Sequence, residues 1–261
     1  IIRWFDKLNC PHPKLPECIA IDEFRGNAGG EKFQCNVADP VKHQVIDILP
    51  SRNTEDLCKH FLEYPYKERA EVKKIVMDLS TLFRSVAKTM FPEAKIVADK
   101  FHVIRVVINS LENVRKRIQK EFHATKRKRF KRSRYLVLKP EYKLTDEDKT
   151  ELARMLNSSY DLEKAYVLKE RFYEVFRKQT RTEAKKELGN WLLLAADLSL
   201  PEFRHCITTF SNWKTEIANI IGERVSNGFI EGSNNKIKVL KRISYGVRNF
   251  DRFRNRILYL E

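Results

Sequence analysis

Three acidic residues stand at positions where their carboxylates could share metal ions. Asp22 and Asp78 each follow a short apolar run, and Glu231 lies near the start of a predicted helix late in the chain. Carboxylates brought together repel one another unless cations neutralise them, and Mg²⁺ and Mn²⁺ prefer oxygen ligands. Two such ions about 4 Å apart activate a water or a hydroxyl and stabilise the leaving oxygen. Taken singly, each acid is equally compatible with a solvated loop residue or a cap.

The apolar runs that precede these acids are predicted to be strands of one sheet. Cys18–Phe24, Lys32–Ala38 and Gln44–Leu49 follow one another through short turns, which predicts three antiparallel strands. A helix is predicted over residues 54–64, with Thr54 as its N-cap. Its apolar residues recur at helical spacing.

A second pattern of strand, helix and strand comes next. Lys74–Asp78 and Lys95–Asp99 are apolar runs that end in an aspartate, and the helix between them covers Thr81–Phe91. This spacing predicts a βαβ unit with parallel strands. The complete order is that of an α/β fold with an RNase H-like mixed sheet, three antiparallel strands and then two parallel ones. Strands one and four are neighbours in that sheet, so Asp22 and Asp78 should lie side by side.

Asp99 competes with Asp78 for the second metal position, because it also ends a predicted strand. The topology favours Asp78, and Asp99 then becomes an accessory group that supports a ligand or helps to hold His102. His102 either contacts a reacting group or orients a carboxylate, or it is a histidine at a helix start with a satisfied hydrogen bond.

The middle of the chain is predicted to be helical throughout. No convincing strand occurs between residues 103 and 224, whereas Thr145–Asp148 is typical of a capping box and Leu162–Phe176 keeps a helical period. We therefore expect three parts. Residues 1–102 form the first part of an RNase H-like core, 103–224 an all-helical insertion, and 225–261 the helices that carry Glu231 and complete the core.

The charge of the chain favours a polyanionic partner. Lys and Arg number 51 against 35 acids, which gives a net charge of +16 and a sequence pI near 9.6. Nucleic acid is the commonest partner of such a protein, and a ribosome-associated or merely soluble basic protein is the alternative. The segment Arg115–Arg134 alone holds 11 Lys or Arg residues against one acid.

The cysteines predict reduced thiols in a cytosolic compartment. Five are scattered without any Cys-x-x-Cys pair, and Cys10 with His12 and Cys18 fits no common zinc module. The sequence contains no signal peptide or transmembrane run, so we expect no membrane partner.

Four ordered motifs resemble those of a known family. They are Leu15-Pro-Glu-Cys-Ile-Ala-Ile-Asp-Glu-Phe24, Ile75-Val-Met-Asp-Leu-Ser80, Ala98-Asp-Lys-Phe-His-Val103 and Ser226-Asn-Gly-Phe-Ile-Glu-Gly-Ser-Asn-Asn-Lys-Ile-Lys238. Together with Lys241–Phe250 they resemble the ISL3 family of bacterial insertion-sequence transposases over essentially the whole chain. The resemblance implies a DDE active site formed by Asp22, Asp78 and Glu231, with two Mg²⁺ or Mn²⁺ ions.

The resemblance also implies double-stranded DNA as the partner, at element ends and at the target, a homo-oligomer, and a place in the bacterial cytoplasm at the nucleoid. Asn234 and Asn235 then bond the DNA backbone or cap helix groups. The candidate phosphate contacts are Arg115, Lys116, Lys126, Arg127, Lys128, Arg129, Lys131, Arg132, Lys236, Lys238, Lys241, Arg242 and Arg248. Family members usually carry a zinc finger and a helix-turn-helix ahead of the catalytic domain, and this chain begins just before Asp22.

The leading hypothesis is a metal-dependent transposase that cleaves DNA and transfers the freed strand. The alternatives are a catalytically silent, transposase-derived DNA-binding protein and a plain RNase H-like nuclease.

Overall fold

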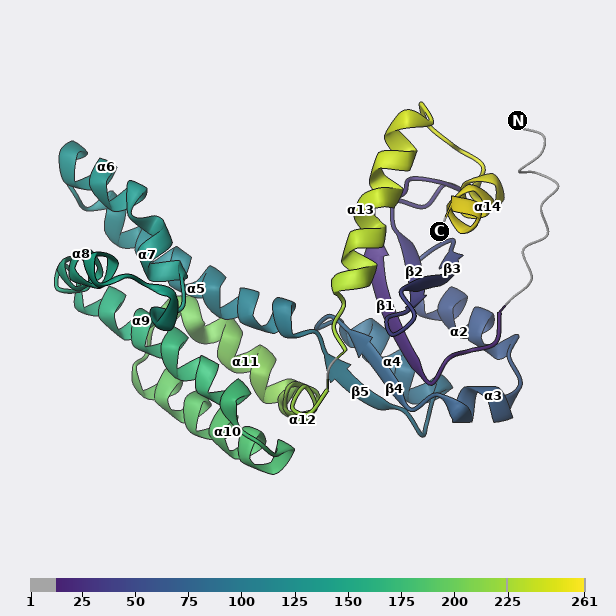
Figure 1. Cartoon of the computed structure of the whole chain (residues 1–261), viewed down its shortest axis with the longest axis horizontal. Coiled ribbons are helices and arrows are strands. Elements are labelled where there is room, and N and C mark those ends of the chain that lie inside the picture. Colours follow the sequence, from purple (N-terminus) through teal and green to yellow (C-terminus); the bar gives the residue numbers. More distant parts are fainter. Residues whose placement is uncertain (1–12, 224, 261) are drawn as a thin grey trace. The chain divides into compact units, whose positions relative to one another are not determined.

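The computed structural model describes residues 13–223 and 225–260, which form two compact units (Figure 1). The first unit joins the residues up to Asp99 to those after 224, and the second is Lys100–Glu223. Cys10 and His12 lie outside the described residues. The cysteines within them, Cys18, Cys35, Cys58 and Cys206, form no disulfide with one another.

The first unit is built on a five-stranded mixed sheet. Its strands are β1 (Cys18–Phe24), β2 (Gln34–Asp39), β3 (Gln44–Leu49), β4 (Lys74–Met77) and β5 (Lys95–Ala98). The spatial order is β3-β2-β1-β4-β5, with β1, β2 and β3 antiparallel and β1, β4 and β5 parallel. The predicted strand order and directions are therefore confirmed, although β2 starts two residues later than expected.

Helices cover both faces of this sheet, which explains why its strands are apolar almost throughout. Helices α13 (Gly228–Ile243) and α14 (Phe250–Leu260) cover one face and bury Ala20 and Phe24 of β1. Helices α2 (Thr54–Leu62) and α4 (Thr81–Met90) lie on the side away from α13 (Figure 1). Side chains alternate along a strand, so Asp22 shares the α13 face with Ala20 and Phe24.

Three local features of this unit differ from the predictions. Asn53, not Thr54, is the N-cap of α2, and Thr54 is the first helical residue. Helix α3 (Tyr66–Glu71) was not predicted, because none of its residues is buried and it therefore lacks an apolar period. Asp78 and Asp99 lie just after β4 and β5 instead of inside them.

The second unit, Lys100–Glu223, is helical and contains no strand. Its elements are α5 (Lys100–Lys120), α6 (Ala124–Arg132), α7 (Arg134–Leu138), η1 (Glu141–Lys143), α8 (Asp146–Leu156), α9 (Tyr160–Tyr173), η2 (Glu174–Arg177), α10 (Arg181–Asp197), η3 (Pro201–Phe203), α11 (Arg204–Asn212) and α12 (Lys214–Ala218). Thr145 caps α8 as predicted, since its hydroxyl accepts the Asp148 N–H. Phe172, Trp191 and Phe210 form an aromatic core with ring centroids 5.0–5.6 Å apart.

No helix in the described part of the chain is long and apolar enough to cross a membrane.

Candidate active site

Two of the predicted acids lie next to each other, Asp22 within β1 and Asp78 just after β4. Ile21 pairs with Met77 in parallel register, so Asp22 and Asp78, which follow them, stand at the same level on neighbouring strands. Adjacent strands are about 4.8 Å apart. This spacing is suited to carboxylates that share metal ions, and both side chains are half-buried.

The negative charge at this end of the sheet acts on a buried neighbour. Burial raises the pKa of the Cys35 thiol well above its usual value, and the carboxylates of Asp22, Glu23 and Asp78 raise it further. Asp22 and Asp78 are the two of these acids that stand side by side at one level of the sheet, and a bound cation would relieve their mutual repulsion. Their oxygen atoms are the donors that Mg²⁺ and Mn²⁺ prefer, so the residues present fit such an ion.

Helix α13 is fixed to Asp22 by a buried amide. The Asn234 Nδ2 donates to Asp22 Oδ2 at 2.9 Å, and the Asn36 Nδ2 of β2 donates to Asn234 Oδ1 at 2.9 Å. The backbone N–H of Glu23 donates to Asp22 Oδ1 at 2.8 Å. These bonds hold the Asp22 carboxylate in one orientation. Asn234 thus bonds protein groups, whereas its neighbour Asn235 is exposed and accepts from Lys238 Nζ at 3.4 Å.

Glu231 lies in the first turn of α13, three residues before Asn234, and its side chain is exposed. The described residues contain no group of three or more His, Cys, Asp or Glu side chains that could hold a metal ion. The structure therefore brings Asp22 and Asp78 together and attaches the helix of Glu231 to Asp22, without gathering all three carboxylates into one cluster.

Asp99 occupies the same level one strand further on, because Met77 pairs with Ala98. Its side chain is buried, and its Oδ1 accepts the backbone N–H of Asn227 at 3.2 Å. His102 lies in the first turn of α5, where its ring packs edge-on against that of Phe101 with centroids 5.8 Å apart.

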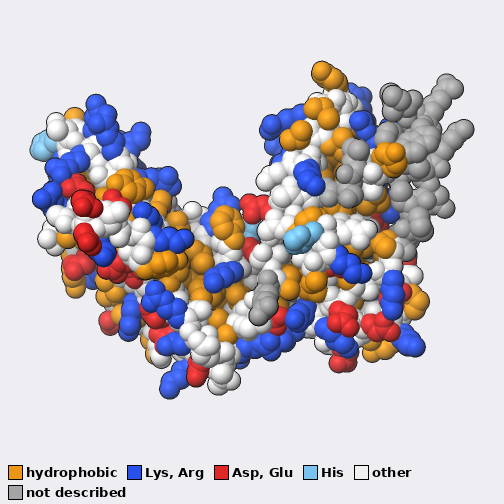
Figure 2. Space-filling model, in the orientation of Figure 1, with side chains coloured by type: hydrophobic (Ala, Val, Ile, Leu, Met, Phe, Trp, Pro, Cys, Tyr) orange, Lys and Arg blue, Asp and Glu red, His pale blue; other side chains and the backbone are white. Residues whose placement is uncertain are grey.

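The predicted DNA contacts of the second unit differ in burial and in whether they pair with an acid. Arg115 does not fit its predicted role as a phosphate contact. Its side chain is buried, and its guanidinium donates to both carboxylate oxygens of Glu112. Arg129 is exposed but pairs with Glu151 at 2.8 Å. The other exposed candidates here are Lys116, Lys126, Arg127, Lys128, Lys131 and Arg132. Lys and Arg side chains gather over α6 in Figure 2.

Two further arginines near the acids were missed by the sequence analysis. The Arg52 Nη1 donates to both carboxylate oxygens of Glu23, at 2.8 and 2.6 Å, and its guanidinium lies 4.6 Å from the centre of the Phe33 ring. Arg25 lies close to Lys241, whose Nζ donates to the Arg25 carbonyl at 3.4 Å. Burial and the charge of Arg25 lower the pKa of Lys241. Since Arg52 is 29 residues from Glu23, no local spacing could have found the pair.

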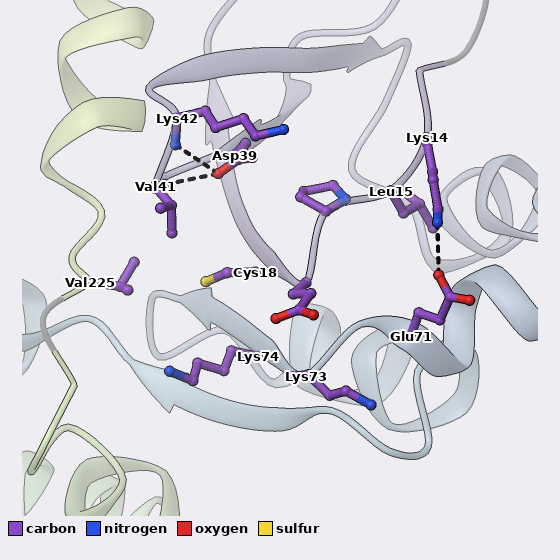
Figure 3. Close-up of a pocket in the computed structure, with 12 residues that line it drawn as sticks. Lys14, Leu15, Cys18, Asp39, Val41, Lys42, Glu71, Lys73, Lys74 and Val225 are labelled. Carbon is purple, nitrogen blue, oxygen red and sulfur yellow. Dashed lines mark hydrogen bonds and ion pairs between the residues drawn. The ribbon is translucent and has the colours of Figure 1, made fainter.

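A cavity of about 640 Å³ lies at the opposite end of the same strands. It is lined by Cys18 and Lys74, the first residues of β1 and β4, and by Lys14, Lys42 and Lys73 (Figure 3). Lys14 points to Glu71 and pairs with it at 2.9 Å. The cavity includes none of the predicted catalytic acids, so it is separate from the candidate active site.

Comparisons with known proteins agree with the resemblance of the motifs. Residues 19–257 match the model of the ISL3 family of DDE transposases, which is described as "Transposase". The chain is 27% identical over 241 residues to the transposase for insertion sequence element IS1001 of Bordetella parapertussis, covering 91% of this chain and 59% of that protein. It is 24% identical over 254 residues to the transposase for insertion sequence element IS1557 of Mycobacterium tuberculosis, covering 88% and 57%.

A shorter match is 36% identical over 94 residues to an "ATP-dependent protease" of Lactococcus lactis, covering 36% of this chain and 26% of that protein. The chain spans less than two thirds of the length of each of these curated relatives.

Proposed function

Because the chain belongs to the ISL3 family of transposases, we propose that it carries the catalytic centre of a metal-dependent DNA transposase. The observation that carries the proposal is the parallel register of β1 and β4, which sets Asp22 beside Asp78. Glu231 completes the proposed triad from α13, and all three acids fall within the matched residues 19–257. The sheet order supports an RNase H-like core, and the helical unit is then an insertion ahead of Glu231.

In this proposal Asp22, Asp78 and Glu231 hold two Mg²⁺ or Mn²⁺ ions. When bound, such ions activate the attacking oxygen and stabilise the leaving oxygen of a phosphodiester. The chain itself orients the ligands. The Asn234 amide holds the Asp22 carboxylate by a hydrogen bond, and the Asn36 amide in turn holds Asn234. Glu231 is the exposed acid, so its carboxylate can approach from the solvent side when an ion binds.

The proposed substrate is double-stranded DNA, both at insertion-sequence ends and at the target. The exposed basic residues of α6, together with Lys236, Lys238, Arg242 and Arg248, would contact its phosphates. Arg25 and Lys241 would add positive charge on the side of α13. Lys241 also donates a hydrogen bond to the Arg25 backbone carbonyl. A homo-oligomer in the bacterial cytoplasm, associated with the nucleoid, belongs to the same proposal.

The test is DNA cleavage and joining by the purified protein. Supercoiled plasmid and a double-stranded oligonucleotide are incubated with Mn²⁺ or Mg²⁺, and nicked, linear and joined products are separated on gels. We expect Asp22→Asn, Asp78→Asn and Glu231→Gln each to abolish products, because each removes a charged oxygen ligand. Glu121→Gln, which changes an exposed acid of the helical unit, is the matched control.

The other outcomes distinguish the alternatives. Products that are equally abundant in all three variants and in the wild type would rule out the proposed triad. Salt-sensitive DNA binding without any product from the wild type would indicate a silent DNA-binding protein. Cleavage without joining would indicate a nuclease.

A further inference from the structure

Asp22 within β1, and Asp78 and Asp99 just after β4 and β5, stand at one level, but their surroundings differ. Ile21, Met77 and Ala98 pair across the sheet, so Asp22, Asp78 and Asp99 form a row. At a strand spacing of about 4.8 Å, Asp99 lies roughly 10 Å from Asp22. Ions of a two-metal site are about 4 Å apart. Asp99 is thus poorly placed to share an ion with Asp22, whereas Asp78 is well placed.

The Asp99 carboxylate is instead bonded to the start of the helix that carries Glu231. Its Oδ1 accepts the Asn227 backbone N–H at 3.2 Å, and Asn227 is the N-cap residue of α13. The Asn227 carbonyl in turn accepts the backbone N–H of Glu231 at 2.9 Å. One residue therefore connects the end of β5 to the peptide group of Glu231.

The chemistry of the helix end explains why an acid is useful there. The first N–H groups of a helix have no partner inside it, and a negative charge near them is favourable. Asn227 makes no capping bond with its own side chain. Asp99, only 3% exposed, supplies an acceptor and a charge from another element, and the N–H donor offsets part of the cost of burying its carboxylate.

We propose that Asp99 is a positioning residue that holds the first turn of α13, and with it Glu231, against the end of the sheet. This inference rests on the proposed function of Glu231. Helix α13 is then attached on both sides of Glu231, by Asn227 to β5 and by Asn234 to β1 and β2. The two attachments fix how far Glu231 stands from Asp22 and Asp78.

Two pairs of variants test the attachment in the full chain. Asp99→Asn keeps an acceptor oxygen for the Asn227 N–H, and Asp99→Ala removes it. Asn227→Pro removes the donor, and its φ of −75° is one that proline adopts. Asn227→Ala keeps the donor and removes a side-chain amide that has no hydrogen-bond partner within the described part of the chain. It is the matched control for the proline variant.

The first readout is hydrogen exchange of the Glu231 amide, which needs neither metal nor DNA. We expect faster exchange in Asp99→Ala and Asn227→Pro, and near wild-type exchange in Asp99→Asn and Asn227→Ala. The Phe253 amide of α14, bonded to the Asn249 carbonyl, serves as the internal reference and confirms that each variant is folded. Unchanged Glu231 exchange in both disruptive variants would overturn the proposal.

The second readout is the affinity for Mn²⁺, titrated alone. Loss of a group that orients a ligand weakens metal binding by about 10- to 100-fold. We therefore expect Asp99→Ala to bind Mn²⁺ more weakly by this factor, and Asp99→Asn to bind it with near wild-type affinity. If Asp99→Asn removes Mn²⁺ binding as completely as Asp78→Asn, Asp99 is itself a ligand and the proposal is wrong. If the wild type binds no Mn²⁺, the proposed function fails, and amide exchange alone decides whether Asp99 holds α13.

Discussion

Asn234 uses both the nitrogen and the oxygen of its side-chain amide to connect helix α13 to the sheet. It donates to the carboxylate of Asp22 and accepts from the amide of Asn36. A carboxylate there would repel Asp22, and an apolar side chain would leave both partners without these bonds. Because Asn234 is 3% exposed, water cannot replace them readily.

We expect Asn234→Leu to lower the free energy of unfolding by about 1–3 kcal/mol, the usual cost of leaving buried polar groups unsatisfied. Urea unfolding followed by circular dichroism measures this change. The neighbouring Asn235→Leu is the control, since an exposed substitution of this kind changes stability by about 0.5 kcal/mol or less. Equal losses in the two variants would show that the Asn234 bonds contribute little.

At the scale of the element, helix α5 is joined to α7 by a buried acid. Glu112 accepts from Arg115 on its own helix and from Arg134 of α7 at 3.0 Å. Burial raises the pKa of Glu112, but the hydrogen bonds and charges of Arg115 and Arg134 outweigh it and lower the pKa below the usual 4.5. A carboxylate with a lowered folded pKa contributes stability above pH 4.5 that is lost as the pH falls through the folded value.

Glu112→Gln should therefore be less stable than the wild type at pH 7, and the difference should narrow as the pH falls below 4.5. Thermal unfolding at pH 7 and at acid pH measures both. Glu121→Gln changes an exposed acid one residue beyond the end of α5 and is the control, since an exposed substitution of this kind changes stability by about 0.5 kcal/mol or less. A difference between wild type and Glu112→Gln that stays constant with pH would contradict the assigned pKa shift.

Helix α6 is the element whose charge we expect to contact DNA. Each phosphate contact contributes about 0.9 to the slope of log affinity against log salt. Lys128→Gln and Lys131→Gln should each reduce that slope by about 1 and weaken binding to all sequences alike. Fluorescence anisotropy over a salt series measures the slope. Lys149→Gln, which removes an exposed lysine already paired with Asp146 at 3.2 Å, should leave it unchanged; a matching decrease there would mean that α6 has no special role.

The helices and strands could be predicted from the sequence where buried residues recur at a regular spacing. The arrangement of the candidate site could be predicted only where the order of the strands determines it. Apolar runs ending in acids gave the strands, and their order placed Asp22 beside Asp78. Asn234 could not be distinguished from Asn235, since both are polar residues of one helix and only packing decides which faces the sheet. The bond from Asp99 to Asn227 spans 128 residues, so no local pattern contains it. The burial of Arg115 could not be predicted either, because it depends on how the Glu112 carboxylate that accepts its hydrogen bonds is oriented.

For the whole molecule, the division into units determines what can fold alone. Lys100–Glu223 is continuous and has its own aromatic core around Phe172 and Trp191. The sheet unit is discontinuous, and without α13 and α14 it would expose Phe24, Val45 and Ile48. Because Asp99 and Asn227 are hydrogen-bonded, a short linker can replace everything between them.

We expect residues 100–223 to unfold cooperatively as an isolated helical protein, and residues 13–99 joined by a short Gly-Ser linker to 225–261 to fold as well. Residues 13–99 alone should not, because one face of the sheet is left uncovered. Circular dichroism melts of the three chains are the measurement. A cooperative melt of 13–99 alone would show that α13 and α14 are dispensable for the sheet.

Because the helical unit interrupts the sheet unit in sequence, the two parts of the sheet unit are synthesised at different times. The ribosome releases Asp22 and Asp78 early, then the whole helical unit, and α13 with Glu231 only afterwards. At about 5–20 residues per second, the intervening segment takes on the order of ten seconds to make. During that interval the nascent chain holds two of its three proposed ligands and one bare face of its sheet. It is then most exposed to aggregation and to chaperones, and the proposed triad is complete only when α13 emerges.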